Sequence, residues 1–301
     1  MLSLSLGFII GIILGSFIAC LANRSLTNKS FWKRSYCDNC KKQLVWYDLI
    51  PIFSFLILKG KSRCCKKKLS KELILVEVLT GLLISLLFFL NLPANFYELT
   101  LVRLILILAD LAFKSFIVVI LISIVITDLK ENLIPDRITY PAAALAFSYL
   151  LIVTISKSTL FYFELKASEL GKYLLPPYSD YFFRQVFMGA EPLIYGVISG
   201  LGLGLFFLIL ILVTRGRGMG GGDMKLGVFL GLVFGFPQSV VVLMLAFLTG
   251  SLFGIILIIF GKKKFGQTIP FGPFLALGGL LSLYWGEKIL NWYLQIPSFL
   301  S

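Results

Sequence analysis

Apolar positions along the chain gather into long runs that polar or basic stretches separate. Eight such runs cover residues 2–22, 73–91, 103–127, 138–155, 192–214, 224–236, 239–260 and 270–286. Most are near the roughly 20 residues that an α-helix needs to cross a bilayer. The sixth run is shorter and ends at Phe236-Pro237, so we expect either an incomplete crossing or a buried inner helix. The pattern predicts an all-α polytopic membrane protein with about eight transmembrane segments.

Composition and charge support this class of protein. Hydrophobic residues make up 58% of the 301 and charged residues 14%, and the net charge is +13. A nucleic-acid partner is not expected, because the positive charges gather in the loops after the first, third, fifth and seventh runs. The loop at 23–71 is the most basic, and the later basic positions are Lys130, Arg137, Arg215, Arg217, Lys262, Lys263 and Lys264. If the runs alternate across the lipid bilayer, these loops share one side, which the positive-inside rule assigns to the cytoplasm, and both termini lie outside.

The loops on the opposite side carry fewer positive charges. The longest, residues 156–191, mixes both signs of charge with Pro and Tyr, and we expect a partly ordered exterior excursion. The first run, 2–22, has no basic start and no convincing cleavage site, so we expect a retained span.

Two aspartates stand where an apolar run meets a polar stretch. Asp128 follows the third run in ITDLKENLIPD, and Asp223 precedes the sixth in MGGGDMKL. Ionisable groups at a membrane boundary are costly and are usually functional. Two carboxylates can share a proton and activate a water, and the chain has no histidine to act as the base. With alternating segments both acids lie at the same cytoplasmic depth, so helix packing could bring them to one site.

Three glycines, Gly220, Gly221 and Gly222, directly precede Asp223. They allow a tight turn and a close approach, so their backbone groups could pair with an extended peptide substrate. The alternative is a flexible loop before a helix, with Asp223 as the N-cap.

Two further charged residues lie near these acids. Lys225 could lower the pKa of Asp223, contact the substrate or snorkel to the interface. Asp136 could be a third acid, but Pro-Asp before an apolar run favours a role at a helix entry.

Four cysteines, Cys37, Cys40, Cys64 and Cys65, lie in the basic loop at 23–71. A cytoplasmic loop lies in a reducing compartment, so metal binding is expected there before disulfides. Four thiolates in one loop suit a tetrahedral zinc ion.

Six stretches, in order along the chain, carry a resemblance to a known family. They are GSFIACLANR (15–24), SYCDNCKKQLVWYDLIPIFSFLILKGK (35–61), LVEVLTG (75–81), ITDLKENLIPDRITYP (126–141), GMGGGDMKLG (218–227) and IPFGPFLALGG (269–279). The chain resembles the bacterial type IV prepilin peptidases, also called leader peptidases and N-methyltransferases, which are GxGD membrane aspartyl proteases. The resemblance implies that Asp128 and Asp223 are the catalytic pair, one as base for the water and one as acid for the leaving amine. Which aspartate takes which role stays open, because a coupled pair titrates as a unit.

The resemblance also implies the partners and the setting. The substrate would be a type IV prepilin or pseudopilin, with a short basic cytoplasmic leader, a Gly before the cut and an apolar helix after it. Many family members then methylate the new amino terminus with S-adenosylmethionine. The setting would be the bacterial inner membrane, with the active site facing the cytoplasm. Residues 1–91 would form the methyltransferase-associated part, and residues 100–291 the GxGD protease core.

The cysteine loop departs from the family pattern. The usual second pair would fall at positions 62 and 65, but position 62 is Ser62, and Cys64 and Cys65 are adjacent. Either Cys64 replaces the missing zinc ligand, or the loop is a partly degenerate knuckle held by packing. This departure puts methylation in more doubt than proteolysis. Glu77, inside the second run, would help to bind the methyl donor or the amine, or it is a satisfied acid within the membrane.

Three alternatives stay open beside the bifunctional peptidase. The first is a protease without methylation. The second is a transporter or channel whose acids within the membrane relay protons or bind cations. The third is a non-catalytic scaffold of a pilus or secretion assembly.

Overall fold

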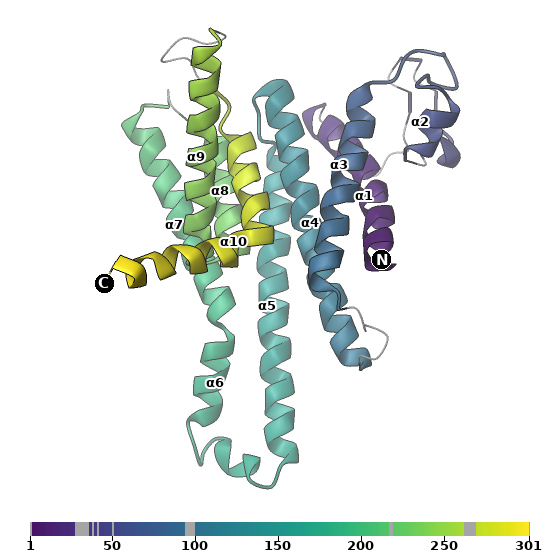
Figure 1. Cartoon of the computed structure of the whole chain (residues 1–301). Coiled ribbons are helices and arrows are strands. Elements are labelled where there is room, and N and C mark those ends of the chain that lie inside the picture. Colours follow the sequence, from purple (N-terminus) through teal and green to yellow (C-terminus); the bar gives the residue numbers. More distant parts are fainter. Residues whose placement is uncertain are drawn as a thin grey trace. The chain divides into compact units, whose positions relative to one another are not determined.

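The computed structural model describes residues 2–27, 36–37, 39–40, 42–49, 51–93, 100–216, 219–261 and 269–300 (Figure 1). The predicted basic positions Arg217 and Lys262, Lys263 and Lys264 lie outside the described residues, as does part of the loop at 23–71. The chain divides into two compact units, Met1–Pro135 and Asp136–Ser301. Each unit is described by itself.

The first unit contains α1 (Leu2–Leu26), η1 (Trp46–Leu49), α2 (Phe53–Ile57), α3 (Lys71–Asn91) and α4 (Leu101–Glu131). The second contains α5 (Asp136–Ala167), η3 (Gly171–Leu174), α6 (Tyr181–Gly189), α7 (Glu191–Val213), α8 (Gly221–Phe234), α9 (Gln238–Ile259) and α10 (Gly272–Leu300). In the described part of the chain, 6 helices are long and apolar enough to cross a membrane, namely α1, α3, α4, α5, α7 and α9. The predicted all-α polytopic membrane fold is confirmed. The predicted division into 1–91 and 100–291 stays a prediction, and in the first unit α4 packs against both α1 and α3.

Helix α1 lies very close to α3 because glycines line the contact. A Cβ added to Gly7 would lie 2.9 Å from the Cα of Ser85, and one added to Gly15 would lie 2.7 Å from the Cα of Glu77. Gly11 falls between them at the same four-residue spacing, so these glycines share one helix face. Small residues at this spacing let membrane helices approach to backbone contact.

Helix α8 is the inner helix of the second unit. It has 14 residues, fewer than the roughly 20 of a full transmembrane helix, and it contacts α5, α7, α9 and α10. Its buried residues are Asp223, Leu226, Gly227, Phe229, Leu230 and Gly231. A Cβ added to Gly231 would lie 2.5 Å from the carbonyl oxygen of Ser199 on α7, so the two backbones touch. The prediction of a buried inner helix for the sixth apolar run is confirmed.

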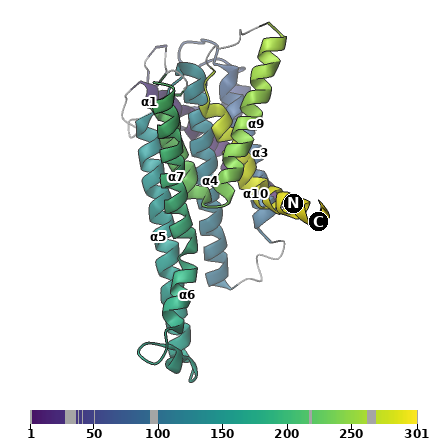
Figure 2. The same cartoon turned by 90° about the vertical axis from the view of Figure 1, so that its left-hand side faces the viewer.

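The segment at 156–191 forms a helical hairpin. Helix α5 has 32 residues, so it is about 48 Å long and exceeds the roughly 30 Å hydrocarbon core of a bilayer. Its last turns lie beside α6, and the rings of Phe161 and Phe182 stack with centroids 6.1 Å apart. Figure 1 and Figure 2 both show α5 and α6 side by side, extending away from the other helices of this unit. The predicted exterior excursion is therefore more ordered than its mixed composition indicated.

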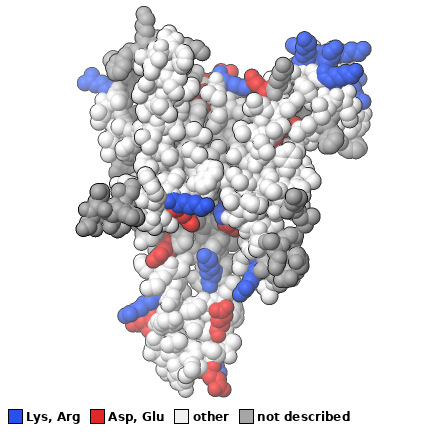
Figure 3. Space-filling model, viewed as in Figure 1, with Lys and Arg blue, Asp and Glu red and all other residues white. Residues whose placement is uncertain are grey.

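Charged side chains are unevenly distributed over each unit. Figure 3 shows basic side chains crowded on the cysteine loop of the first unit, and both signs of charge along the α5–α6 hairpin of the second. Uncharged side chains cover most of the remaining face that this view presents. Many large apolar side chains are exposed on these helices, and such outer faces suit a lipid surrounding.

Candidate active site and metal centre

Asp128 lies in the last turn of α4 and is buried, with 5% of its surface exposed. The C-cap residue of this helix is Asn132, which has a φ of 50° and donates its backbone N–H to the carbonyl of Asp128 at 2.9 Å. Asparagine tolerates this left-handed conformation better than most residues, which explains the helix end. At the same end, Lys130 forms an ion pair with Glu72 at the start of α3, with 3.2 Å between Lys130 Nζ and Glu72 Oε2. The fold therefore holds a buried carboxyl group within one turn of the end of a membrane-spanning helix.

Asp223 is the third residue of α8 and is 8% exposed. The helix N-cap is Gly220, whose N–H donates to Asp223 Oδ2 at 3.3 Å. The alternative that Asp223 is itself the N-cap is therefore wrong. A carboxyl group in the first turn of a helix is favoured by the positive end of the helix dipole.

The packing of α8 on α7 indicates where Asp223 lies along α7. A Cβ added to Gly227 would lie 2.6 Å from the ring of Phe207. Because α7 and α8 are antiparallel, stepping four residues back along α8 and four forward along α7 leads us to expect Asp223 near the level of Ile211. Helix α7 ends at Val213, so Asp223 lies within about one turn of that helix end. Asp128 and Asp223 belong to different compact units, and their meeting at one site stays a prediction.

Two of the glycines before Asp223 have open space around them in the part of the chain that the structure describes. Among these residues, a Cβ added to Gly221 would meet nothing within 4 Å, and one added to Gly220 would meet only the Gly222 nitrogen, at 3.9 Å. Gly220 has a φ of −90°, a conformation that any residue adopts. Neither packing nor backbone conformation in the described residues requires glycine at position 220, so room for another chain is a physical reason for it.

Lys225 is bound to Asp136 instead of pointing alone toward solvent. Its Nζ lies 2.5 Å from Asp136 Oδ1, and it also lies 5.2 Å from the ring centre of Tyr140. Asp136 is the first residue of α5, so this pair fastens the start of α8 to the start of α5. The predicted role of Asp136 at a helix entry agrees with this position, and substrate binding by Lys225 stays a prediction.

Glu77 lies on α3 and is 2% exposed. Its Oε2 accepts a hydrogen bond from the backbone N–H of Ile52 at 2.8 Å, and the Ser16 hydroxyl also hydrogen-bonds this carboxyl group. Ile52 lies in the cysteine loop, 25 residues away in sequence. No feature of the sequence around Ile52 indicated this contact, because a backbone N–H donor carries no residue signature.

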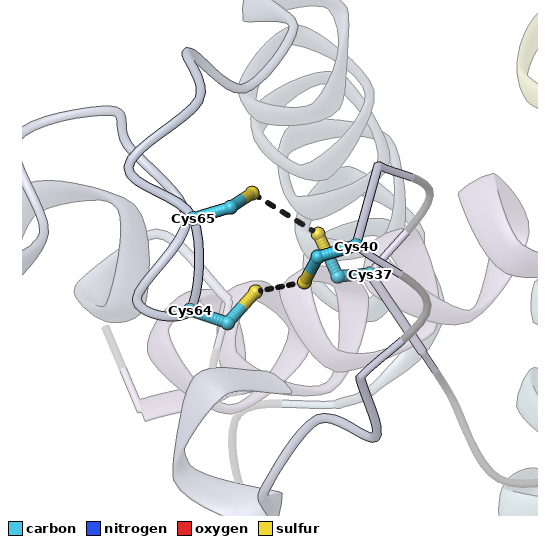
Figure 4. A group of neighbouring side chains, drawn as sticks. All are labelled: Cys37, Cys40, Cys64 and Cys65. Atoms are coloured by element: carbon cyan, nitrogen blue, oxygen red, sulfur yellow. Dashed lines mark hydrogen bonds between the residues drawn. The ribbon is translucent and has the colours of Figure 1, made fainter.

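The four loop cysteines lie together (Figure 4). Their sulfur atoms all lie within 4.8 Å of one another, with 3.7 Å between Cys37 and Cys65 and 2.9 Å between Cys40 and Cys64. Four sulfurs at about 2.3 Å from a tetrahedral zinc ion would be about 3.8 Å apart, so small movements of Cys40 and Cys64 would suffice. The chemistry and spacing of these residues fit a metal ion.

Ser62 supports the cysteine cluster without replacing a ligand. Its hydroxyl lies 3.0 Å from Cys65 Sγ and is buried. This contact lowers the pKa of the Cys65 thiol to about 6, and the Lys67 backbone adds to the effect. Backbone N–H groups of Cys40 and Asn39 lower the pKa of Cys37 in the same direction. The hydrogen bond with Cys40 raises the pKa of Cys64 to about 12.

Comparison with known proteins places these residues in context. Residues 9–91 match the bacterial peptidase A24 N-terminal domain, and residues 178–255 match the type IV leader peptidase family. The cysteines and Glu77 fall within the first range, Asp223 falls within the second, and Asp128 lies between them.

Several curated proteins are similar over most of the chain. The prepilin leader peptidase/N-methyltransferase of Aeromonas salmonicida (strain A449) is 32% identical over 264 residues, which are 87% of this chain and 75% of that protein. The protein of the same description from Legionella pneumophila is 29% identical, over 88% of this chain and 76% of that protein. The one from Bacillus subtilis (strain 168) is 27% identical, over 97% of this chain and 98% of that protein. No solved structure matches the chain.

Proposed function

Because this chain belongs to the type IV leader peptidase family, we propose that it removes the leader from type IV prepilins or pseudopilins and then methylates the new amino terminus. The observation that carries this proposal is the similarity to prepilin leader peptidase/N-methyltransferases over most of the chain. The chain is an aspartic endopeptidase and methyltransferase of the bacterial inner membrane. Its substrates, by the name of these relatives, are prepilins.

The catalytic pair in this proposal is Asp128 and Asp223. Each is a buried carboxyl group within about one turn of the end of a helix, where an apolar segment meets a polar loop. One carboxylate takes a proton from water, which attacks the carbonyl carbon of the scissile peptide bond. The other carboxylic acid donates its proton to the amide nitrogen as the carbon–nitrogen bond breaks. The leader leaves with a new carboxyl terminus, and the pilin keeps a free amino terminus.

The substrate approaches through the open space beside Gly220 and Gly221. An extended leader junction there can pair its backbone with the glycine backbone, while the apolar pilin helix stays in the bilayer. This arrangement requires the acids to face the cytoplasm, where the basic leader lies, and we propose that orientation. It places both termini of the chain outside.

S-adenosylmethionine would supply the methyl group to the new amino terminus, which would give up a proton, and S-adenosylhomocysteine would be the other product. We assign this step to the first unit because the cysteine loop belongs to it. Cys37, Cys40, Cys64 and Cys65 would hold a zinc ion that fixes the loop conformation. Cys64 then takes the place that Ser62 leaves without a thiol, while the Ser62 hydroxyl supports Cys65.

The test uses membranes that carry the wild type, Asp128→Asn or Asp223→Asn, mixed with a prepilin from the same genome. Intact-mass spectrometry reads the product. Because a positioned acid or base contributes about 10²–10⁴-fold to the rate, each variant should lose cleavage by at least about a hundredfold while still inserting in the membrane. Asp180→Asn, an acid on the α5–α6 hairpin, is the matched control and should cleave like the wild type. Substantial cleavage by Asp128→Asn or Asp223→Asn would remove that residue from the pair.

The same spectra separate methylation from proteolysis. A mature pilin with one additional methyl mass supports the bifunctional enzyme, and an unmethylated product supports a protease alone. No loss of the leader with a correctly inserted substrate would favour a transporter or a scaffold.

Zinc is tested by elemental analysis of the purified protein. We expect about one zinc ion per chain in the wild type, and a loss of zinc and methylation in Cys37→Ser with cleavage largely kept. Cys20→Ser is the matched control, because Cys20 lies in α1 outside the cluster. A wild-type protein without zinc would contradict the metal site.

A further inference from the structure

One carboxyl group joins three parts of the first unit. Glu77 belongs to α3, Ser16 belongs to α1, and Ile52 belongs to the cysteine loop. The Glu77 carboxyl group accepts a hydrogen bond from the Ile52 N–H at 2.8 Å and also hydrogen-bonds the Ser16 side chain. It is almost completely buried. No ion pair involves Glu77 among the described residues. Since burying a carboxyl group is costly, its hydrogen bonds are the visible compensation.

The backbone that Glu77 holds is in an uncommon conformation. Ile52 has a φ of 58° and a ψ of −51°, close to the rare and strained γ-turn conformation. Branching at Cβ makes this region especially unfavourable for isoleucine. Such a conformation persists only where the surroundings enforce it. A hydrogen bond from this N–H to a carboxyl group fixed on α3 is one contact that enforces it.

Ile52 also occupies the middle of the cysteine loop. It lies midway between Cys40 and Cys64, 12 residues from each. Ile52 is the N-cap residue of α2, which leads through a turn to the strand-like pairing of Lys61 with Lys68. The cysteine cluster thus closes the two halves of the loop onto each other, and Glu77 attaches the segment between them to the membrane helices.

The loop between these two attachments is internally connected. Arg63, next to Cys64, donates to Asp48 Oδ1 at 2.8 Å and lies 4.7 Å from the ring centre of Tyr47. Leu69 donates its N–H to the carbonyl of Gly60 at 2.8 Å. These contacts connect the described parts of the loop to one another, so the hydrogen bond with Glu77 can set their position on α3.

We propose that Glu77 is a positioning residue that seats the metal-binding loop on the α1–α3 helix pair, acting as a hydrogen-bond acceptor for Ile52 and not through its charge. This inference rests on the proposed methyl-transfer function only for its consequence, because seating the loop sets where methylation occurs relative to the membrane. It differs from the prediction that Glu77 binds the methyl donor or the amine, since a cationic ligand would require the negative charge.

The experiment compares Glu77→Gln with Glu77→Ala in the purified full chain. Glutamine keeps an oxygen acceptor of nearly the same shape, whereas alanine removes it. Glu72→Ala is the matched control, because Glu72 lies on the same helix and is exposed. The first readout is the rate of tryptic cleavage at the exposed loop lysines Lys59 and Lys61, and the second is the rate of zinc loss to a chelator. The third is the methylated fraction of the pilin product.

Glu77→Ala should be cut in the loop and lose zinc at least about tenfold faster than the wild type, because the part-buried Ile52 N–H loses its acceptor. It should also lose methylation while it keeps prepilin cleavage. Glu77→Gln and Glu72→Ala should match the wild type in all three readouts.

Two results would overturn the inference. One is a Glu77→Ala protein whose loop is as well protected as in the wild type. The other is a Glu77→Gln protein that keeps zinc and loop protection but loses methylation, because the charge would then be what matters. Loop proteolysis needs neither zinc nor substrate, so a wild type that fails to cleave or methylate prepilin would count against the proposed function alone.

Discussion

At the scale of single residues, Asp136 and Lys225 illustrate how a tertiary contact assigns a role. The two side chains are 89 residues apart in sequence and form an ion pair, in which Lys225 follows the buried Asp223 by two residues along α8. Their side chains are 56% and 30% exposed, so the pair stabilises the fold by only about 0–1 kcal/mol. Its main effect is therefore local, at the start of α8.

We expect Lys225→Met and Asp136→Asn to lower the cleavage rate similarly, each by less than about tenfold. The double variant should be no worse than either single variant, because both remove the same contact. Steady-state kinetics with a prepilin peptide would measure kcat and KM for each. A rise in KM that only Lys225→Met produces would instead support direct contact between Lys225 and the substrate.

The residues with chemical signatures could be identified from the sequence. Asp128 and Asp223 stood at apolar boundaries, and the four cysteines stood in one basic loop. The contact between Glu77 and Ile52 and the pairing of Lys225 with Asp136 could not be identified, because each joins segments that only the fold brings together. Cys64, adjacent to Cys65, reaches the cluster because the turn at 63–65 directs both sulfurs toward Cys37 and Cys40.

At the scale of helices, backbone contact at glycine determines how α7 and α8 pack. Gly231 touches the backbone of α7, where a Cβ would lie 2.5 Å from the Ser199 oxygen. A Cβ added to Gly202, on α7, would meet no atom within 4 Å among the residues that the structure describes. The two glycines differ in surroundings and not in secondary structure, which makes them a matched pair.

Gly231→Ala should destabilise the protein by about 1–3 kcal/mol, because the added methyl group forces the two helices apart. Gly202→Ala should leave stability unchanged or raise it by up to about 1 kcal/mol, since alanine favours a helix. Unfolding by a denaturing detergent in mixed micelles would measure both. Equal stability of the two variants would contradict the close approach at Gly231.

Each of the eight apolar runs corresponds to a helix, but the helix ends often lie elsewhere. Helix α5 continues to Ala167, well past the predicted end of its run at 155, and α10 continues past 286. An apolar run marks the part of a helix that lies in lipid, so it does not show where the helix continues into water. Packing of Phe161 against Phe182 supports the part of α5 that the pattern missed.

At the scale of the whole molecule, the direction in which the chain inserts determines which side of the membrane each candidate site faces. The proposed orientation places the cysteine loop and both acids inside, and the α5–α6 hairpin outside. The meeting of Asp128 with Asp223 was predicted from alternation of the segments, and it depends on packing between units that no sequence pattern encodes.

Glu169→Cys and Thr27→Cys test this orientation, because both positions are exposed and lie in opposite predicted compartments. In intact spheroplasts, a bulky membrane-impermeant maleimide should label Glu169→Cys at the new cysteine. The labelled variant should then migrate more slowly on a gel than the wild type treated in the same way. Thr27→Cys should shift only after permeabilisation. The reverse pattern would invert the topology and place the acids outside.

The short, buried α8 has a consequence for the permeability barrier of the cell. Beyond Asp223 the helix presents Leu226, Phe229 and Leu230, all fully buried, and just past its far end the rings of Tyr195 and Phe236 lie edge to face with centroids 6.5 Å apart. On the proposed mechanism, water that reaches Asp223 meets these apolar side chains before it can continue along α8. We therefore expect peptide hydrolysis at the membrane surface without a leak of protons or ions, which would preserve the energy stored across the membrane.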